Sequence, residues 1–145
     1  MNQKSTFAGG CQCGAVRYEF TAAPGELMMF KCHCRDCQRL SGGPYTPVVY
    51  LPAAAGRLNI VCGRVKHHFT AGEKGPHQRG FCADCGSRLT GGESPHGIAV
   101  TASSLDDPSL FQPAAETWLC DAQPWDPPLP GLPRFDRYAS PQPKA

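Results

Sequence analysis

Apolar and polar side chains alternate along residues 15–21, which is the pattern of a strand with one buried and one solvated face. Three further segments, at residues 46–51, 97–101 and 116–120, are also predicted to be strands. A short apolar run at 27–31 leads into a cysteine-rich segment. Pro47 cannot donate a ladder hydrogen bond, so we expect the start of 46–51 to lie at a sheet edge.

Residues 58–62 and 65–70 flank Gly63 and Arg64, an arrangement that predicts a β-hairpin. One or two helical turns are expected at residues 35–40. The chain contains 16 Gly and 15 Pro, and breakers at this density disfavour long helices. The pattern therefore predicts a mostly β protein with almost no helix.

Neither end of the chain shows a strong structural pattern. Residues 1–6 are interpreted as a loose terminus, and the proline-rich tail is expected to pack on the domain through Trp125, Leu132 and Phe135. No apolar run approaches the roughly 20 residues of a membrane helix, and the N-terminus has no apolar signal segment. We expect one domain over residues 1–145, with its core at about 9–135, in the cytoplasm.

Cysteine is frequent, with nine residues in a chain of 145. In the cytoplasm thiols stay reduced, and an odd number prevents a full disulfide framework within one chain. Disulfide pairing is the less favoured alternative, because closely spaced cysteines in such a chain are typical of metal sites.

Two tight cysteine turns lie about 70 residues apart, at Cys11 and Cys13 and at Cys82 and Cys85. Each has a glycine directly after its last thiol, where a positive φ lets the backbone aim both sulfurs at one ion. Zinc in structural sites prefers four tetrahedral ligands, so these thiols predict a structural zinc. Redox dithiols or buried thiols are the alternatives. The two turns indicate either an internal duplication or an unrelated similarity.

A third cluster, C-H-C-R-D-C, places Cys32, Cys34 and Cys37 within six residues. Three protein ligands and one open position are the arrangement of a catalytic zinc. Such an ion keeps a bound thiol deprotonated, which suits making or breaking a carbon–sulfur bond. Cys62 or Cys120 is the alternative fourth ligand, which would make this second site structural. A redox-active thiol cluster is a further alternative.

The order of these motifs resembles the glutathione-dependent formaldehyde-activating enzyme family, which includes centromere protein V. The resemblance runs from about Gly9 to Phe135. It rests on G-G-C-x-C-G-A-V-R-Y, K-C-H-C-x-x-C, R-G-F-C-x-x-C-G-S, S-L-D-D-P and a late tryptophan, Trp118. Two features depart from the family pattern. Glu116 stands where many members carry His, and the longer loop before Arg79 has F-T-A-G in place of Y-x-S-S.

The resemblance implies an Mss4-like fold, in which several small coiled antiparallel sheets are stapled by zinc. It implies a structural zinc on the two cysteine turns and a second, catalytic or labile zinc on the central cluster. The implied reaction adds the thiol of glutathione to formaldehyde and gives S-hydroxymethylglutathione, which is the chemistry of a carbon–sulfur lyase.

Glutathione has two carboxylates, so its site needs cations. Arg79 is the best candidate because it lies three residues before a cysteine turn and a guanidinium can bind a carboxylate through two hydrogen bonds. Arg35 is the second candidate, and Lys31 and Arg39 also lie near the clusters. A surface ion pair is the alternative role for Arg79.

Several other residues are expected to be structural. His33 is interpreted as a packing or supporting residue, and Cys62 and Cys120 as small buried hydrophobes. Asp36 is expected to bind backbone amides of its turn or to be solvated. His67, His68 and His77 are expected to be solvated, with proton relay as the alternative. Trp118 and Trp125 are expected to be core or tail anchors, with a substrate wall as the alternative.

The formal net charge is only +2, which gives no argument for nucleic acid or a membrane surface as a partner. We expect a small thiol such as glutathione and a small aldehyde to bind a monomer or homodimer. The alternative is a non-catalytic module in which both zinc ions are structural and the surface binds another protein.

Overall fold

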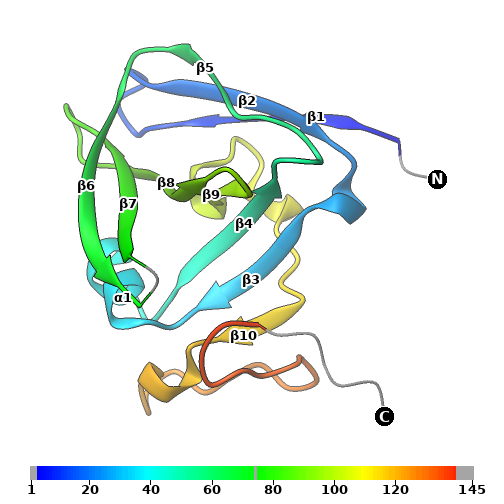
Figure 1. Cartoon of the computed structure of the whole chain (residues 1–145), viewed down its shortest axis with the longest axis vertical. Helices are drawn as coiled ribbons and strands as arrows, with labels where there is room; N and C mark the ends of the chain where they lie inside the picture. Colours follow the sequence, from blue (N-terminus) through cyan, green and yellow to red (C-terminus); the bar gives the residue numbers. More distant parts are fainter. Residues whose placement is uncertain (1–2, 74, 140–145) are drawn as a thin grey trace.

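A computed structural model describes residues 3–73 and 75–139 (Figure 1). Its strands form a three-stranded sheet in the order β1-β2-β5 and a seven-stranded sheet in the order β10-β3-β4-β9-β8-β7-β6. The strands are β1 (Ser5–Gly10), β2 (Arg17–Ala22), β3 (Met28–Cys32), β4 (Thr46–Pro52), β5 (Asn59–Cys62), β6 (Val65–Gly72), β7 (Gly75–Cys82), β8 (Arg88–Ser94), β9 (Gly97–Thr101) and β10 (Ala115–Thr117). The helices are α1 (Arg35–Ser41) and the short 3-10 turns η1 (Pro24–Glu26), η2 (Ala102–Ser104), η3 (Pro108–Leu110) and η4 (Leu119–Asp121).

The mostly β class with antiparallel sheets is confirmed; among the named strands of the described residues, β10 and β3 pair in parallel. Within the described ranges, no helix is long and apolar enough to cross a membrane. β1 was not predicted, and it includes Ser5 and Thr6, so the interpretation of 1–6 as a loose terminus is wrong for these two residues. Its sequence, S-T-F-A-G-G, lacks the apolar alternation that identifies a strand.

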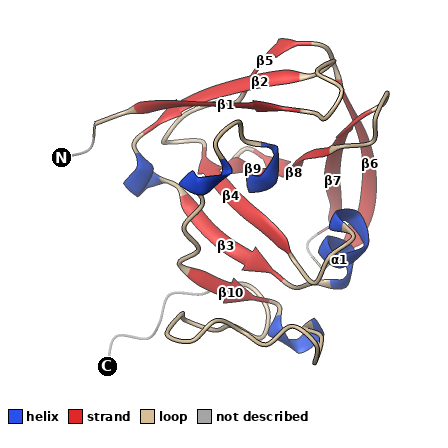
Figure 2. Cartoon of the chain, turned by 180° about the vertical axis from the view of Figure 1, so that it is seen from behind, coloured by secondary structure: helices blue, strands red, loops and turns tan. Residues whose placement is uncertain are grey.

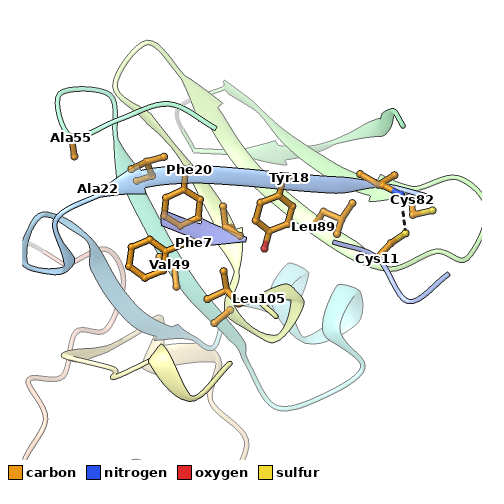
Figure 3. Packing of buried hydrophobic residues seen from close by; sticks show 14 residues of the cluster. Phe7, Cys11, Tyr18, Phe20, Ala22, Val49, Ala55, Cys82, Leu89 and Leu105 are labelled. Atoms are coloured by element: carbon orange, nitrogen blue, oxygen red, sulfur yellow. Dashed lines mark hydrogen bonds between the residues drawn. The ribbon is translucent and has the colours of Figure 1, made fainter. Parts of the chain in front are cut away.

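The hydrophobic core lies between the two sheets (Figure 3). Phe7, Tyr18 and Phe20 project from the three-stranded sheet, and each is at most 5% exposed. Val49 of β4 and Leu89 of β8 meet them from the seven-stranded sheet and are fully buried. Burying such side chains stabilises the fold by roughly 1.5–3 kcal/mol each, so this layer is the main apolar contribution to stability.

The predicted hairpin of 58–62 and 65–70 does not form. β5 pairs with β2 in one sheet, whereas β6 pairs with β7 in the other. Gly63 has φ 73, and a Cβ atom there would lie 2.0 Å from the carbonyl oxygen of Ala15. The chain therefore leaves β5 for the other sheet close against the backbone that precedes β2, where only a residue without a side chain fits.

β4 lies inside the seven-stranded sheet, between β3 and β9, but its first two residues pair with β3 alone, so the predicted edge position is correct for the start of the strand. Pro47 pairs with Lys31 on the β3 side, but pairing with β9 begins only at Val48. Pro47 thus lies beyond the end of β9, where its missing N–H leaves no ladder bond unmade.

The C-terminal segment folds back beside β10 (Figure 2). Phe135 donates its N–H to the carbonyl of Glu116 at 2.9 Å, and Glu116 donates its own N–H to Pro133 at 3.0 Å. Leu132 and Phe135 are partly buried, as expected of anchors. Trp125 is 67% exposed, so its predicted anchoring role is wrong, and backbone hydrogen bonds contribute to fixing the segment.

The carboxylate of Glu116 is a buried junction between this segment and β3. Its Oε1 lies 3.1 Å from both Lys31 Nζ and His33 Nε2, and its Oε2 accepts the N–H of Leu129 at 2.8 Å. Burial raises the pKa of Glu116, but the hydrogen bonds from Lys31 and His33 together lower it by more. The pKa of Glu116 therefore lies below its usual value. The glutamate is therefore a charged partner for the buried lysine.

Replacing Glu116 by Gln is expected to destabilise the fold strongly, because it keeps the shape of the side chain but leaves Lys31 charged and unpaired in the interior. Breaking a buried pair on one side typically costs about 3–5 kcal/mol. Urea denaturation followed by circular dichroism measures the loss. Glu19→Gln, at an exposed position of β2, is the matched control, and equal stability of the two variants would contradict the prediction.

Candidate functional site

The two cysteine turns predicted to share an ion lie together. Cys11 and Cys13 follow β1, Cys82 ends β7 and Cys85 lies in the turn before β8. All four sulfurs lie within 4.8 Å of one another. Figure 3 shows Cys11 and Cys82 at one end of the hydrophobic core, where both are buried, whereas Cys13 and Cys85 are exposed.

The spacing of these sulfurs fits a tetrahedral ion. Zinc–sulfur bonds of about 2.3 Å in a tetrahedron place the sulfurs about 3.8 Å apart. The separations from Cys13 Sγ are 3.6 Å to Cys11 Sγ and 3.8 Å to Cys82 Sγ. The four thiols therefore form a set that could hold a zinc ion without rearrangement.

The backbone conformation of the two turns favours this arrangement of the four sulfurs. Gly14 and Gly86 have φ values of 81 and 78, as expected for the glycine after each pair. The N–H of Val16 donates to Cys11 Sγ at 3.2 Å, and the hydroxyl of Ser87 lies 3.2 Å from Cys85 Sγ. The hydrogen bond from Ser87 lowers the pKa of Cys85 to about 5, which favours the thiolate that a metal binds.

The central cluster also comes together. Cys32 ends β3, Cys34 caps the N-terminus of α1 by accepting the N–H of Cys37 at 3.3 Å, and Cys37 lies in the first turn of α1. Their sulfurs lie within 4.8 Å of one another, with no fourth metal-binding side chain of the described residues in the group. The neighbouring thiols Cys32 and Cys34, and then the charge of Arg88, lower the pKa of Cys37. The spacing of the three sulfurs could therefore hold one metal ion.

A cavity of about 560 Å³ opens directly onto these three thiols. It lies between one face of β3, β4 and β9, the β6–β7 hairpin, and the C-terminal segment. Pockets of this size usually take a small molecule, and this one is larger than a single metal-bound water requires. Trp118 also lines the cavity, so it is a wall of the pocket as well as an anchor.

Two buried or half-buried arginines face the cavity. Arg79 is 6% exposed, and its guanidinium lies 3.4 Å from the Asp36 carboxylate and donates to Thr70 at 3.1 Å. Arg88 donates to Thr46 at 2.8 Å, its Nε is buried without a hydrogen-bond partner, and no carboxylate in the described part of the chain pairs with it. Arg88 is therefore the arginine with free capacity for an anionic ligand.

Arg88 was not among the cations predicted from the sequence. The signal was available, since Arg88 follows Cys85 by three residues just as Arg79 precedes Cys82 by three. Of the predicted cations, Arg79 and Arg35 line the cavity, whereas Lys31 is buried against Glu116 and Arg39 is exposed and outside the cavity lining. Asp36 pairs with Arg79, which was not among its expected roles.

The other predictions for single residues have mixed outcomes. His33 is fully buried and bonded to Glu116, which confirms its supporting role, and His67 and His68 are exposed as expected. His77 instead lines the cavity, and burial followed by the charge of Arg79 lowers its pKa. Cys62 and Cys120 are exposed, so their prediction as buried hydrophobes is wrong, and neither belongs to the metal-binding group.

Comparison with known proteins bears on this arrangement. The sequence model described as glutathione-dependent formaldehyde-activating enzyme matches residues 6–121, which include all seven clustered cysteines. The chain belongs to this family. A crystal structure of a protein from Rhodobacter sphaeroides is also similar, with a TM-score of 0.55 at 19% identity over 88% of this chain and 98% of that one. At that identity, the similarity concerns the fold alone.

Membership of the glutathione-dependent formaldehyde-activating enzyme family agrees with the mostly β fold and with two cysteine clusters that could bind metal. Arg79 and Arg88 also fall within the matched residues. The family description names glutathione and formaldehyde.

Cys85→Ser is expected to lower the zinc content from about two ions per chain to about one. It is also expected to destabilise the protein by more than about 2 kcal/mol, because the free energy of metal binding at such a site contributes to folding. Cys85 is exposed, so lost packing cannot account for a large effect. Zinc is counted by atomic emission after purification without chelator, and stability is measured by thermal denaturation.

Cys62→Ser is the matched control for Cys85→Ser, because Cys62 is also an exposed thiol but lies outside both clusters. It is expected to keep both the zinc content and the melting temperature of the unmodified protein. Equal behaviour of the two variants would show that the two cysteine turns, at Cys11 and Cys13 and at Cys82 and Cys85, do not hold a structural ion.

Proposed function

We propose that this chain is a zinc-dependent carbon–sulfur lyase-type enzyme that adds the thiol of glutathione to an aldehyde. The observation that supports this most directly is the cavity that joins the three thiols of Cys32, Cys34 and Cys37 to Arg88, whose Nε has no hydrogen-bond partner and which no carboxylate of the described residues pairs with. Zinc held by those thiols supplies a Lewis acid that keeps a bound thiol deprotonated near neutral pH. The family description agrees with both substrates.

The residues of the chain bind and orient glutathione in this proposal. Arg88 takes one carboxylate of the tripeptide, and Arg35, at the cavity rim, is placed for the other. Arg79 lines the same wall but is held by Asp36 and Thr70, so it mainly raises the positive potential of the pocket. The sulfur of glutathione then lies next to the cysteine cluster, where the aldehyde carbon meets it.

The neutral form of His77 is favoured because its pKa is lowered by burial and by Arg79. A neutral imidazole on the cavity wall can accept the proton released by an incoming thiol. In this proposal, His77 is therefore the group in the pocket that takes up and returns the proton of the reaction.

The rival function is a non-catalytic module with structural zinc at both clusters. That function needs a fourth protein ligand at the second cluster, and the described residues supply three. The rival also gives no reason for a cavity at the thiols or for an arginine left without a carboxylate. We therefore favour the enzyme, and we also propose a cytoplasmic location, where the thiols stay reduced.

Cobalt in place of zinc offers a spectroscopic test of this choice. Titration of the cobalt-loaded protein with glutathione is expected to add sulfur-to-cobalt charge-transfer absorption, because the open position accepts one more thiolate. S-methylglutathione, which cannot form a thiolate, is the control ligand and should leave that band unchanged. A spectrum unaffected by glutathione would favour two closed structural sites.

Arg88→Gln is expected to weaken glutathione binding by roughly 10- to 100-fold, the range for the loss of a charged hydrogen bond to a carboxylate. Isothermal titration calorimetry measures the dissociation constant, and zinc content is checked in the same sample. Arg39→Gln removes the same charge from an exposed position outside the cavity lining and should bind glutathione like the unmodified protein. Equal affinities of the two variants would contradict the role of Arg88.

A further inference from the structure

One face of β3 carries a row of side chains that begins at the cysteine cluster. Residues two apart on a strand point to the same side, so Met28, Phe30 and Cys32 form this row, and all three line the cavity. At about 3.3 Å per residue, the row extends about 13 Å from Cys32 to Met28. The cavity wall that runs along β3 from Cys32 to Met28 is therefore apolar.

The neighbouring strands widen this row into a surface. Phe30 lies opposite Val48 of β4, and Met28 lies opposite Tyr50, which in turn pairs with Ala99 of β9. All of these residues line the cavity. We call Met28, Phe30, Val48, Tyr50 and Ala99 the apolar wall. The arginines lie on β7 and β8, so the cavity has one apolar and one cationic wall that meet at the cysteine cluster.

The proposed substrates use only part of this cavity. Glutathione ends in two carboxylates and an ammonium group, for which the cationic wall and solvent are suitable surroundings. Formaldehyde has a single carbon atom and reaches no further than the sulfur that it joins. With glutathione bound to the arginines as proposed, the apolar wall stays uncovered, and Met28 at its far end is 50% exposed. Apolar surface left open inside a cavity indicates a ligand group that covers it.

We infer that the aldehyde of this enzyme carries an apolar substituent, an alkyl chain or an aryl ring, that lies on the apolar wall. The inference rests on the proposed function, since it assigns the second substrate of the same site. With the sulfur of glutathione at the cysteine cluster, the substituent on the adjacent carbon extends along Phe30 toward Met28. Methionine adapts its shape to different ligands, which suits the outer end of such a wall.

The reaction balances without any further reagent. The thiolate sulfur of glutathione donates an electron pair to the carbonyl carbon and forms the carbon–sulfur bond. The π pair of the carbonyl moves to its oxygen, which takes the proton that the thiol released, and the product is a 1-hydroxyalkyl thioether. In the reverse direction the carbon–sulfur bond breaks and returns aldehyde and thiol, and nothing is oxidised or reduced.

Stable thioethers test this inference by binding alone. S-methylglutathione and S-hexylglutathione differ by five methylene groups on the sulfur, and a fully buried methylene is worth about fourfold in affinity. Calorimetric titration of the zinc-loaded full chain is expected to show S-hexylglutathione binding at least about tenfold more tightly than S-methylglutathione, because part of the chain stays in contact with solvent.

Met28→Glu is expected to reduce this tenfold ratio to about threefold or less, since a carboxylate at the end of the wall opposes burial of the hexyl group. Val61→Glu is the matched control, because Val61 is 53% exposed, is likewise apolar, and lies on β5 outside the cavity lining. It should keep the full ratio. A ratio unchanged by Met28→Glu would overturn the inference.

The outcomes also separate this inference from the function on which it rests. Equal affinities for the two thioethers, with glutathione itself still bound, would overturn the apolar substituent and leave the proposed function in place. Failure of glutathione to bind at all would overturn both. Tighter binding of the hexyl compound that depends on Met28 would support both.

Discussion

The convergence of Cys11 and Cys13 with Cys82 and Cys85 is the constraint on which the rest of the structure depends. The two pairs are about 70 residues apart, and they join the end of β1, in one sheet, to the turn between β7 and β8, in the other. Closing a loop of that length costs entropy that a tetrahedral ion can repay, because its binding energy exists only in the folded state. The cluster lies at one end of the core, so the two sheets are held where their side chains interdigitate.

The seven-stranded sheet has the hydrophobic core on one face and the cavity on the other. Because side chains alternate across β4, Val49 and Leu51 face the core, whereas Val48 and Tyr50 face the cavity. The face that supports the site is therefore anchored by the best-packed part of the molecule. This rigidity is useful for a site whose three thiols must stay at fixed separations.

The junction of Glu116 with Lys31 and His33 ties the C-terminal segment to the same site. Lys31 and His33 flank Cys32, so the strand that carries the first thiol is held from behind by a buried, charged hydrogen-bond network. The segment that Glu116 positions also brings Trp118 and Asp121 to the cavity wall. Glu116 thus links the proline-rich C-terminal segment, which has little regular structure, to the strand that carries Cys32.

Local patterns in the sequence were sufficient for much of this protein. The alternation in residues 15–21 and the cluster at 97–101 predicted β2 and β9, and the spacing of seven cysteines with Gly14 and Gly86 predicted two metal-binding groups, because both kinds of signal depend on neighbours along the chain. Tertiary structure alone decided which strands pair. It sent β5 and β6 to different sheets, placed β4 inside a sheet, and exposed Cys62 and Cys120. These outcomes depend on contacts between segments far apart in sequence, and no local pattern of residues encodes such contacts.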